Sequence, residues 1–359
     1  MKTIELIGLD AQFNMVDYIA YTNLQWRRKW YESGTFSVQI PARTYNPAVK
    51  YLYTKDRPEV GEITQVNYIA GNEGYVFALS GYFLEEQLNE RCVYPKGEGN
   101  ILNAPSWVNQ SGKAEDVAIE FFRAFKDVQV EGKSAILDIA VGTSKHRGKH
   151  AEHERIKARL GDKIHTILKP SEMSYKILYD FVSNTRTFAP VQGRNLTASH
   201  EIEDNPVTFS TAFGNLKNPN IKLDTGNYRN SYIASNTYSN DNIDHTDIQA
   251  AINAAGGERA RFLYVDESLR KSDYSISSDY IDAMHAAAKE ELSKHVKEAA
   301  FDFEAIPGSY VYMEDFDLGD KCSLEVPEIQ LSKDAVLIEC TEVIKKGTHT
   351  LSMKFDTDN

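Results

Sequence analysis

Cysteine is scarce in this chain of 359 residues, which contains only Cys92, Cys322 and Cys340. The set is odd in number and has no close pair, whereas disulfide frameworks and zinc sites use closely spaced or paired cysteines. We therefore expect neither a disulfide framework nor a zinc site. Reduced cysteines in or near strands are the expectation.

Long apolar runs are also missing. No stretch approaches the roughly 20 apolar residues that a membrane-spanning helix needs. The first ten residues, MKTIELIGLD, have the pattern of a strand and do not resemble a signal peptide. These two features predict a protein that is made in a cytoplasm, stays soluble there and has no membrane segment.

Positively charged residues are fewer than negatively charged ones: the chain has 40 Lys and Arg against 52 Asp and Glu, which gives a net charge of −12. An acidic chain is a poor candidate for general nucleic-acid binding, which depends on neutralising phosphates. Residues 144–163 are a basic exception and contain His146, His150 and His153. On a helix the first two would share a face, but no cysteine or ligand motif accompanies them. We expect a solvated loop or helix here, with binding to an anionic partner surface as the open alternative.

Common signatures of catalysis are absent. The sequence has no phosphate-binding P-loop, no dinucleotide-binding glycine pattern after a strand, and no zinc-protease or serine-hydrolase motif. Asp241, Asp244 and Asp247 lack the spacing and the glycine of a calcium loop, so we expect a solvated loop followed by a helix N-cap. We predict a protein that is not an enzyme and that has no cofactor, no metal and no catalytic residues.

The carboxylates of residues 315–320, DFDLGD, are the one cluster that could perform acid–base chemistry. A glycosidase needs two carboxylates at a fixed separation across a sugar, and closeness in sequence does not establish that. We expect a turn between strands, with Gly319 at a positive φ.

Aromatic residues are abundant, with 20 Tyr and 16 Phe, and they fill β cores and oligomer interfaces more often than sugar-binding grooves.

Residues 21–41, YTNLQWRRKWYESGTFSVQIP, predict a hairpin whose second arm, residues 36–40, alternates strictly and buries one face. Its first arm mixes aromatic and basic residues, which concentrate where proteins meet. The alternative is a half-buried strand whose basic side chains cover neighbouring apolar surface. Five residues are therefore interface candidates: Trp26, Arg27, Arg28, Trp30 and Tyr31. We expect Trp26 to pack inward and Arg27 or Arg28 to reach a neighbouring subunit.

The hydrophobic pattern divides the chain into three predicted domains, 1–103, 104–205 and 206–359. The first is β-rich, with strands at 4–9, 36–40, 63–70 and 75–80 and a short helix at 83–88. The second contains one helix after Ser111 and another that starts at Pro170 and buries Ile177, Leu178, Phe181 and Val182. The third begins with a linker segment and returns to β, with helices at 248–255 and 280–296 and strands at 260–265, 301–305, 336–343 and 349–355. Two β-rich lobes thus bracket a helical middle, which is an α+β, mainly β class.

Four segments carry a resemblance through their order and spacing. They are Leu24-x-Trp26 with Tyr31-Glu32-x-Gly34-x-Phe36; Ser80-Gly81 with Leu84, Leu88 and Arg91; Phe209-Ser210 with Phe213-Gly214-Asn215-Leu216 and Tyr228-x-Asn230; and Glu258-Arg259 with Tyr264-Val265-Asp266 and Asp317-Leu318-Gly319-Asp320. Over nearly the whole chain this set resembles the tail-hub family of long-tailed phages and prophages, also called tail-tip or tail-associated proteins. The family is similar to the central hub of contractile-tail baseplates.

The resemblance implies a homotrimer with two tube-like β-barrel or sandwich domains per subunit, so that six related domains form a ring. It implies a structural role, joining the tail tube and the distal tail protein to the tip. The implied partners are the distal tail, tail-tube and tape-measure proteins and a tail fibre or receptor-binding protein, while DNA passes through the ring without specific binding. The implied location is the virion tail, after assembly in the bacterial host cytoplasm. Many family members carry a C-terminal enzymatic extension, which we expect to be missing here or supplied by another protein.

Two other functions stay open at this point. One is a cell-wall-degrading enzyme with Asp315, Asp317 or Asp320 as candidate acids. The other is a carbohydrate-binding tail protein that contacts the host surface through exposed aromatics, with Trp107 as the first candidate.

Overall fold

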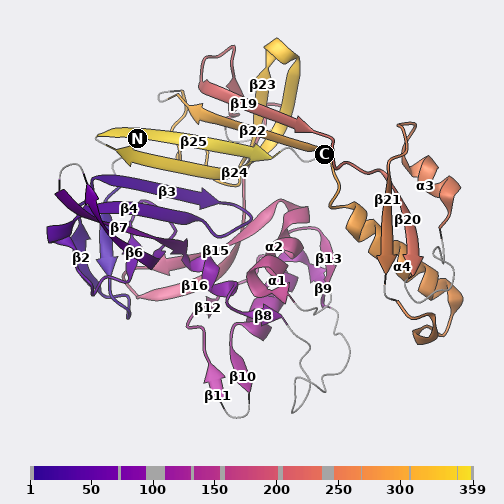
Figure 1. Cartoon of the computed structure of the whole chain (residues 1–359), viewed down its shortest axis with the longest axis horizontal. Coiled ribbons are helices and arrows are strands. Elements are labelled where there is room, and N and C mark those ends of the chain that lie inside the picture. Colours follow the sequence, from indigo (N-terminus) through magenta and orange to yellow (C-terminus); the bar gives the residue numbers. More distant parts are fainter. Residues whose placement is uncertain are drawn as a thin grey trace. The chain divides into compact units, whose positions relative to one another are not determined.

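The computed structural model describes residues 4–71, 74–93, 110–130, 133–153, 158–200, 205–236, 246–267, 269–306, 309–345 and 347–356. The chain forms two compact units (Figure 1). The first consists of Met1–Pro219 and Asp302–Asp356, and the second of Asn220–Phe301 and Thr357–Asn359. The three-domain division at residues 103 and 205 stays a prediction.

The N-terminal part of the first unit is built mainly of antiparallel strands. They are β1 (Leu6–Leu9), β2 (Met15–Ile19), β3 (Asn23–Lys29), β4 (Thr35–Pro41), β5 (Tyr51–Tyr53), β6 (Gly61–Gly71), β7 (Gly74–Phe83) and β8 (Cys92–Val93), with 3-10 turns η1 (Ala42–Thr44) and η2 (Leu84–Leu88). The four strands and the short helix expected in this part are confirmed. The predicted hairpin is formed by β3 and β4, which pair antiparallel with Trp26 opposite Phe36.

The middle of the first unit packs two helices on a small sheet. Its elements are β9 (Gln110–Lys113), α1 (Ala114–Phe125), β10 (Val128–Val130), β11 (Lys133–Ala135), β12 (Ala140–Val141), β13 (His150–His153), β14 (Ala158–Arg159), α2 (Leu160–Leu168), η4 (Lys169–Ser171), β15 (Met173–Asp180) and β16 (Thr185–Gln192). The expected helix α1 is confirmed, and its apolar face joins a large core with α2, β15 and β16.

The helix predicted from Pro170 is wrong. Pro170 lies in the 3-10 turn that follows α2, and the next residues form β15, which pairs with β16 along its whole length. Leu178 and Val182 are 40% and 95% exposed. A short apolar run fits a buried strand as well as a helix, and the pairing with β16 decides for the strand.

The last part of the chain returns to the N-terminal sheet. Its strands in or leading into the first unit are β17 (Asn195–Leu196), β18 (Thr208–Ser210), β19 (Leu216–Asp224), β22 (Glu298–Ala305), β23 (Lys321–Val326), β24 (Leu331–Lys345) and β25 (Thr348–Asp356), with η6 (Pro327–Ile329). The strands expected at 301–305, 336–343 and 349–355 are confirmed, whereas β23 was not predicted. Because β24 pairs antiparallel with β3, the two ends of the chain share one sheet.

This sheet has 14 strands among the described residues, in the order β19-β22-β25-β24-β3-β4-β7-β6-β5-β1-β2, with β17, β18 and β23 beside it. The path has two unpaired ends, so within the described residues it does not close into a barrel. Trp26, Phe36 and Phe83 lie together in the core over the N-terminal strands. All three cysteines are free and lie in strands, as expected: Cys92 in β8, Cys322 in β23 and Cys340 in β24.

The second unit is small. It contains β20 (Ser231–Asn236), α3 (Ile248–Ala254), β21 (Phe262–Glu267), η5 (Lys271–Asp273) and α4 (Ser277–Leu292). The strands are parallel, and α4 covers one face with Tyr280, Met284 and Ala288. The two helices and the strand predicted here are confirmed. The predicted N-cap is confirmed too, since the Asp247 side chain accepts a hydrogen bond of 2.9 Å from the amide of Ala250.

Candidate assembly interface

The aromatic and basic arm of the hairpin is largely internal. Trp26 is fully buried and packs on Phe83 at a ring distance of 4.7 Å, as expected. Trp30 is 3% exposed and packs against Gly319, where an added Cβ would come within 2.4 Å of the Trp30 ring. Gly319 has a φ of 94°, which confirms the turn predicted in residues 315–320. This contact fixes the end of the hairpin arm against that turn.

Arg28 is buried inside this chain. It shares the inward face of β3 with Trp26 because alternate residues of a strand point the same way. Its Nε donates to both carboxylate oxygens of Glu59 at 2.8 and 2.9 Å. Its Nη1 donates to the Tyr312 hydroxyl at 2.6 Å and to Asp317 Oδ1 at 2.7 Å. A guanidinium bound by these three residues and 2% exposed has an internal role in the subunit.

A lysine extends this buried network. Lys176 Nζ of β15 lies 3.3 Å from Glu59 Oε1 and 3.7 Å from Glu85 Oε1. Burial alone would raise the pKa of Glu59, but the charges of Arg28 and Lys176 lower it below its usual value. Burial raises the pKa of Glu85, and the charge of Lys176 offsets this only in part. The network joins β3, β15 and the 312–317 segment.

A second ionic cluster ties the loop before β6 to the C-terminal strands. Arg57 binds Glu342 of β24 through two nitrogens, at 2.8 and 2.5 Å. His349 Nε2 of β25 lies 3.1 Å from Glu342 Oε1. Burial would raise the pKa of Glu342, but the hydrogen bonds with His349 and Arg57 lower it to about 2.

Two of the five interface candidates have side chains that remain partly exposed to solvent. Arg27 points away from the core, and its side chain is 41% exposed while it binds Glu339 at 2.7 Å. Tyr31 is partly buried, with the Lys169 ammonium 5.3 Å from its ring centre. That Trp26, Arg27, Arg28, Trp30 and Tyr31 lie at a subunit boundary stays a prediction. The burial of Trp26, Arg28 and Trp30 confines direct contact with a neighbour to Arg27 and Tyr31.

The candidate catalytic carboxylates have structural partners. Asp317 binds Arg28, and Asp320 accepts hydrogen bonds from the Arg194 side chain at 2.7 and 3.1 Å and from its amide at 2.7 Å. Asp315 accepts from the Val311 amide at 2.6 Å. These contacts hold the turn in front of β23.

The histidines of the basic stretch do not share a helix. His146 has a φ of 57° and contacts Asp116 at 2.9 Å, whereas His150 lies in β13 next to Ser111. Within the described residues no group of three or more His, Cys, Asp or Glu could hold a metal ion. Trp107, Asp241 and Asp244 lie outside the described residues.

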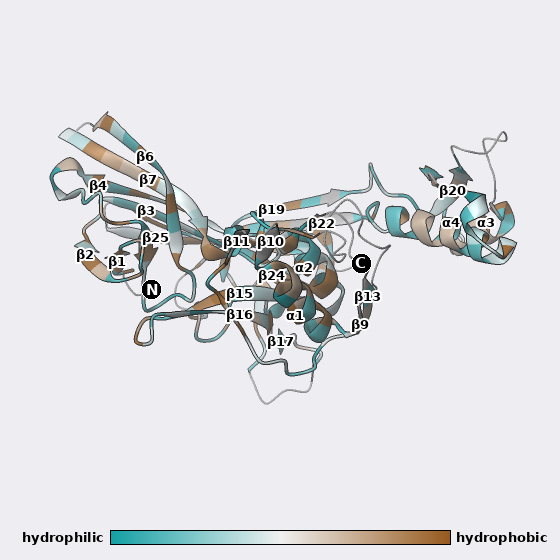
Figure 2. Ribbon diagram, turned by 90° about the horizontal axis from the view of Figure 1, so that it is seen from below, coloured by the Kyte–Doolittle hydropathy of each residue, from teal (hydrophilic) through white to brown (hydrophobic). Residues whose placement is uncertain are grey.

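A group of exposed apolar residues lies on the β6–β7 hairpin. The two strands were predicted, but the exposure of their apolar side chains was not. Residues 64–70 of β6 are all exposed, so both faces of this strand reach the surface. Tyr68 and Tyr75 are 58% and 60% exposed and stack at a ring distance of 5.2 Å. Figure 2 shows β6 and β7 as long neighbouring ribbons with hydrophobic stretches along them. The apolar side of the hairpin therefore continues beyond the core.

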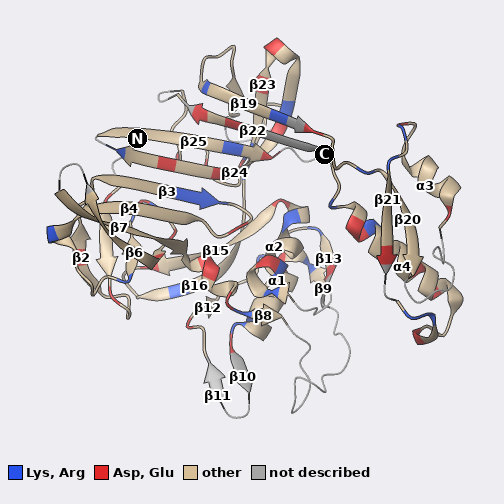
Figure 3. Ribbon diagram, viewed as in Figure 1, with Lys and Arg blue, Asp and Glu red and all other residues tan. Residues whose placement is uncertain are grey.

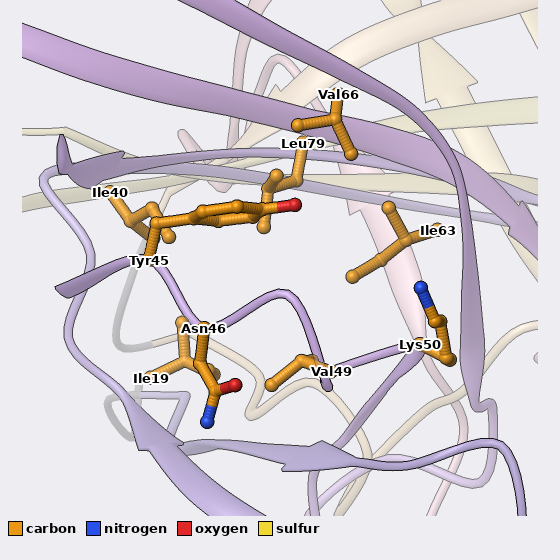
Figure 4. A pocket seen from close by; sticks show the side chains of 9 residues that line it. All are labelled: Ile19, Ile40, Tyr45, Asn46, Val49, Lys50, Ile63, Val66 and Leu79. Carbon is orange, nitrogen blue, oxygen red and sulfur yellow. The ribbon is translucent and has the colours of Figure 1, made fainter.

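One edge of β6 is also unpaired. Strand β5 pairs with β6 only at Gly61 and Glu62, while β7 covers the other edge. Beyond Ile63, the outer edge of β6 has no partner strand among the described residues. At its base lies a pocket of about 60 Å³, where Val66 and Leu79 face Ile19 and Val49 across the opening (Figure 4). This edge and the aromatic side of the hairpin form the β6 edge surface, defined as residues 64–70 with Tyr75.

The family model described as Siphovirus ReqiPepy6 Gp37-like protein matches residues 5–355. The chain belongs to this family. Two solved structures share its fold. The 43 kDa tail protein of prophage MuSo2 from Shewanella oneidensis has a TM-score of 0.58 at 10% identity, with 98% of each chain covered. The tail protein from Neisseria meningitidis MC58 has a TM-score of 0.54 at 11% identity, with 99% of this chain and 96% of that chain covered.

The resemblance drawn from the four sequence segments is confirmed by these findings, since a siphovirus family model matches and the fold is that of prophage tail proteins. No curated protein matches the chain. Across the described residues, no helix is both long enough and apolar enough to cross a membrane.

Proposed function

We propose that this chain is the subunit of a homotrimeric hub in a phage or prophage tail tip. The hub joins the tail tube and the distal tail protein to the tip, with two tube-like β domains per subunit arranged in a ring. The family match and the tail-protein fold support a place in the tail. The single observation that carries self-assembly is the open β6 edge.

Soluble proteins protect strand edges with charged residues, proline or bulges, because an open edge pairs with other chains. Residues 64–70, TQVNYIA, contain neither a charge nor a proline. The register shift of β6 lies between Ile63 and Gln65, at the start of the exposed part. Beyond this shift the edge carries neither charge nor proline, and exposed Val66, Tyr68 and Ile69 lie beside it, which fits pairing with a strand from another subunit.

A cyclic trimer needs two different surfaces on each copy, because head-to-tail contacts join unlike patches. The β6 edge surface supplies one of them. The ends of the sheet path, β19 and β2, supply further unpaired edges among the described residues. The charge balance supports the proposal as well: in an acidic chain, an uncharged strand lets two copies approach without like-charge repulsion.

In the assembled tail, we infer contacts with the distal tail, tail-tube and tape-measure proteins and with a tail fibre or receptor-binding protein. The acidic chain suits a ring through which DNA passes without specific binding, since duplex affinity comes from neutralised phosphates. The role is structural, and assembly takes place in the host cytoplasm.

Light scattering of the purified chain, alone and mixed with its distal tail and tail-tube proteins, tests the proposal. The expected mass of the assembled species is three times the 40.5 kDa of one chain. Ile69→Lys should shift this species toward the monomer, because it places a charge on an exposed position of the β6 edge surface. Val182→Lys is the matched control, since Val182 is 95% exposed on a different hairpin.

The outcomes separate two parts of the proposal. A wild-type chain that stays monomeric even with the other tail components contradicts the trimeric hub. A trimer that survives Ile69→Lys contradicts only the use of the β6 edge.

A further inference from the structure

The second unit contains an open, basic cavity that the proposed hub function does not use. Its volume is about 540 Å³, and its seven lining residues include three arginines and no acidic residue. The arginines are Arg229, Arg259 and Arg261, and Phe262 adds an aromatic ring to the wall. Figure 3 shows basic residues in the segment that leads into β21. A local excess of positive charge is unexpected in a chain with a net charge of −12.

Main-chain contacts fix the positions from which these arginines project. The Arg229 amide donates to the His295 carbonyl at 2.9 Å. The Arg261 amide donates to Asn230 Oδ1 at 2.8 Å, and Asn230 Nδ2 donates to the Arg259 carbonyl at 3.2 Å. The backbone around the cavity is therefore held in place independently of any ligand.

Two of the guanidinium groups donate hydrogen bonds to carbonyl oxygens, and Arg261 also lies 5.6 Å from the centre of the Tyr228 ring. Arg261 Nη1 donates to Thr225 O at 2.9 Å, and Arg229 Nη1 donates to Tyr228 O at 2.9 Å and Gly226 O at 3.2 Å. Both groups make these hydrogen bonds through Nη1 alone. A guanidinium has three nitrogens that together carry five N–H donors, so these hydrogen bonds use only some of its donors. Within the described part of the chain, Arg229, Arg259 and Arg261 form no ion pair.

The nearest acidic side chains are engaged elsewhere. Glu258 binds Lys297 at 2.7 Å, and Asp224 binds Lys222 at 2.9 Å and the Gly226 amide at 2.8 Å. Each carboxylate is thus already matched by a lysine. Glu258 feels the charge of Arg261 but forms its ion pair with Lys297. The three arginines therefore keep an excess of positive charge, and a bound anion would relieve their mutual repulsion.

We propose that this cavity binds a phosphate group carried by a larger ligand. A carboxylate offers two oxygens and is satisfied by one arginine, whereas a phosphate offers more acceptor oxygens and more charge, which three arginines can share. The open cavity has room for a phosphate ion and for part of the group that carries it. The remaining space, beside Phe262, would hold the part of the ligand that carries the phosphate.

Calorimetric titration of the full-length chain tests this proposal with three probes: pyrophosphate, glycerol 3-phosphate and a short single-stranded oligonucleotide. These arms distinguish a free phosphate, a small phosphomonoester and a phosphodiester polymer as sources of the same group. Arg259→Gln is the cleanest variant, because no side-chain contact of Arg259 stabilises the fold among the described residues. It should weaken binding of the preferred probe about tenfold, as expected for the loss of one charge-assisted contact. Arg123→Gln, an exposed arginine of α1 that pairs with Glu120, is the matched control and should bind normally.

Three results would overturn the proposal: no binding of any probe at millimolar concentration, equal binding by wild type and Arg259→Gln, or equal weakening by Arg123→Gln. Tight binding of an oligoglutamate peptide that none of the phosphate probes displaces would also overturn it, by assigning the cavity to an acidic protein segment. The oligomeric state plays no part in these measurements, so they stand apart from the test of the hub.

Discussion

Arg28 should be among the most sensitive positions of the first unit. Replacing it with Met keeps a long apolar side chain but leaves Glu59 and the Tyr312 hydroxyl without their guanidinium partner. Lys176, 3.3 Å from Glu59, then remains as the only cation on that carboxylate among the described residues. Breaking a buried ion pair by removing one partner costs about 3–5 kcal/mol. For a domain of this size, each kcal/mol of lost stability lowers the melting temperature by about 2–4 °C, so the melting temperature of Arg28→Met should fall by roughly 10 °C.

Arg27→Met is the matched control for this experiment. Arg27 is the neighbouring residue of the same type, on the opposite face of β3, and its partly exposed pair with Glu339 should contribute about 0–1 kcal/mol. Urea unfolding followed by tryptophan fluorescence gives the free energy of unfolding of both variants. Adding Glu59→Gln to Arg28→Met should recover at least about 1 kcal/mol, because it removes a buried charge that has lost its guanidinium partner. If Arg28→Met is no more destabilising than Arg27→Met, the buried network does not stabilise the unit as argued.

Two further perturbations address the second ionic cluster and the second unit. The folded-state pKa of Glu342 is lowered to about 2 from 4.5, so its stabilisation is complete above the unfolded pKa and is lost as the pH falls from about 5 toward 2. Near neutral pH, wild type should therefore be more stable than Glu342→Gln by about 3 kcal/mol. This difference in unfolding free energy should shrink as the pH falls over that range. A constant difference would contradict the pairing of Glu342 with Arg57 and His349. Asp247→Ala should destabilise α3 by about 1 kcal/mol, measured as faster amide exchange in α3, while Asp247→Asn should keep most of the protection. Equal exchange in both variants would show that the cap does not hold the helix.

The local pattern of the chain predicted the elements that carry a clear period. Alternation in residues 36–40 predicted β4, and the apolar face of residues 118–125 predicted α1. The pattern failed at β15, because an apolar run of this length fits either a buried strand or a helix until a partner strand is known. It also missed β23.

The roles of individual residues at the candidate interface were less predictable. Arg28 looked like a surface residue because it stands in a basic run, yet its partners Glu59 and Asp317 are 31 and 289 residues away in sequence. In β6, the sequence indicated a strand at residues 63–70, and nothing local indicated that its apolar side chains would extend past the core. The clustering of Arg229 with Arg259 and Arg261 likewise depends on the parallel pairing of β20 with β21.

By itself, the sequence determined the family, the mainly β class, the hairpin of residues 21–41 and the cap of α3, since periodicity, capping residues and ordered motifs are local properties of the chain. The tertiary structure decided which apolar faces are covered, which charges are buried in pairs and which strand edge stays open. These depend on contacts between segments far apart in sequence, above all on the pairing of β24 with β3 that brings both ends of the chain into one sheet. Trp26 and Arg28 therefore belong to the interior of the subunit, and an exposed apolar surface lies on β6 and β7.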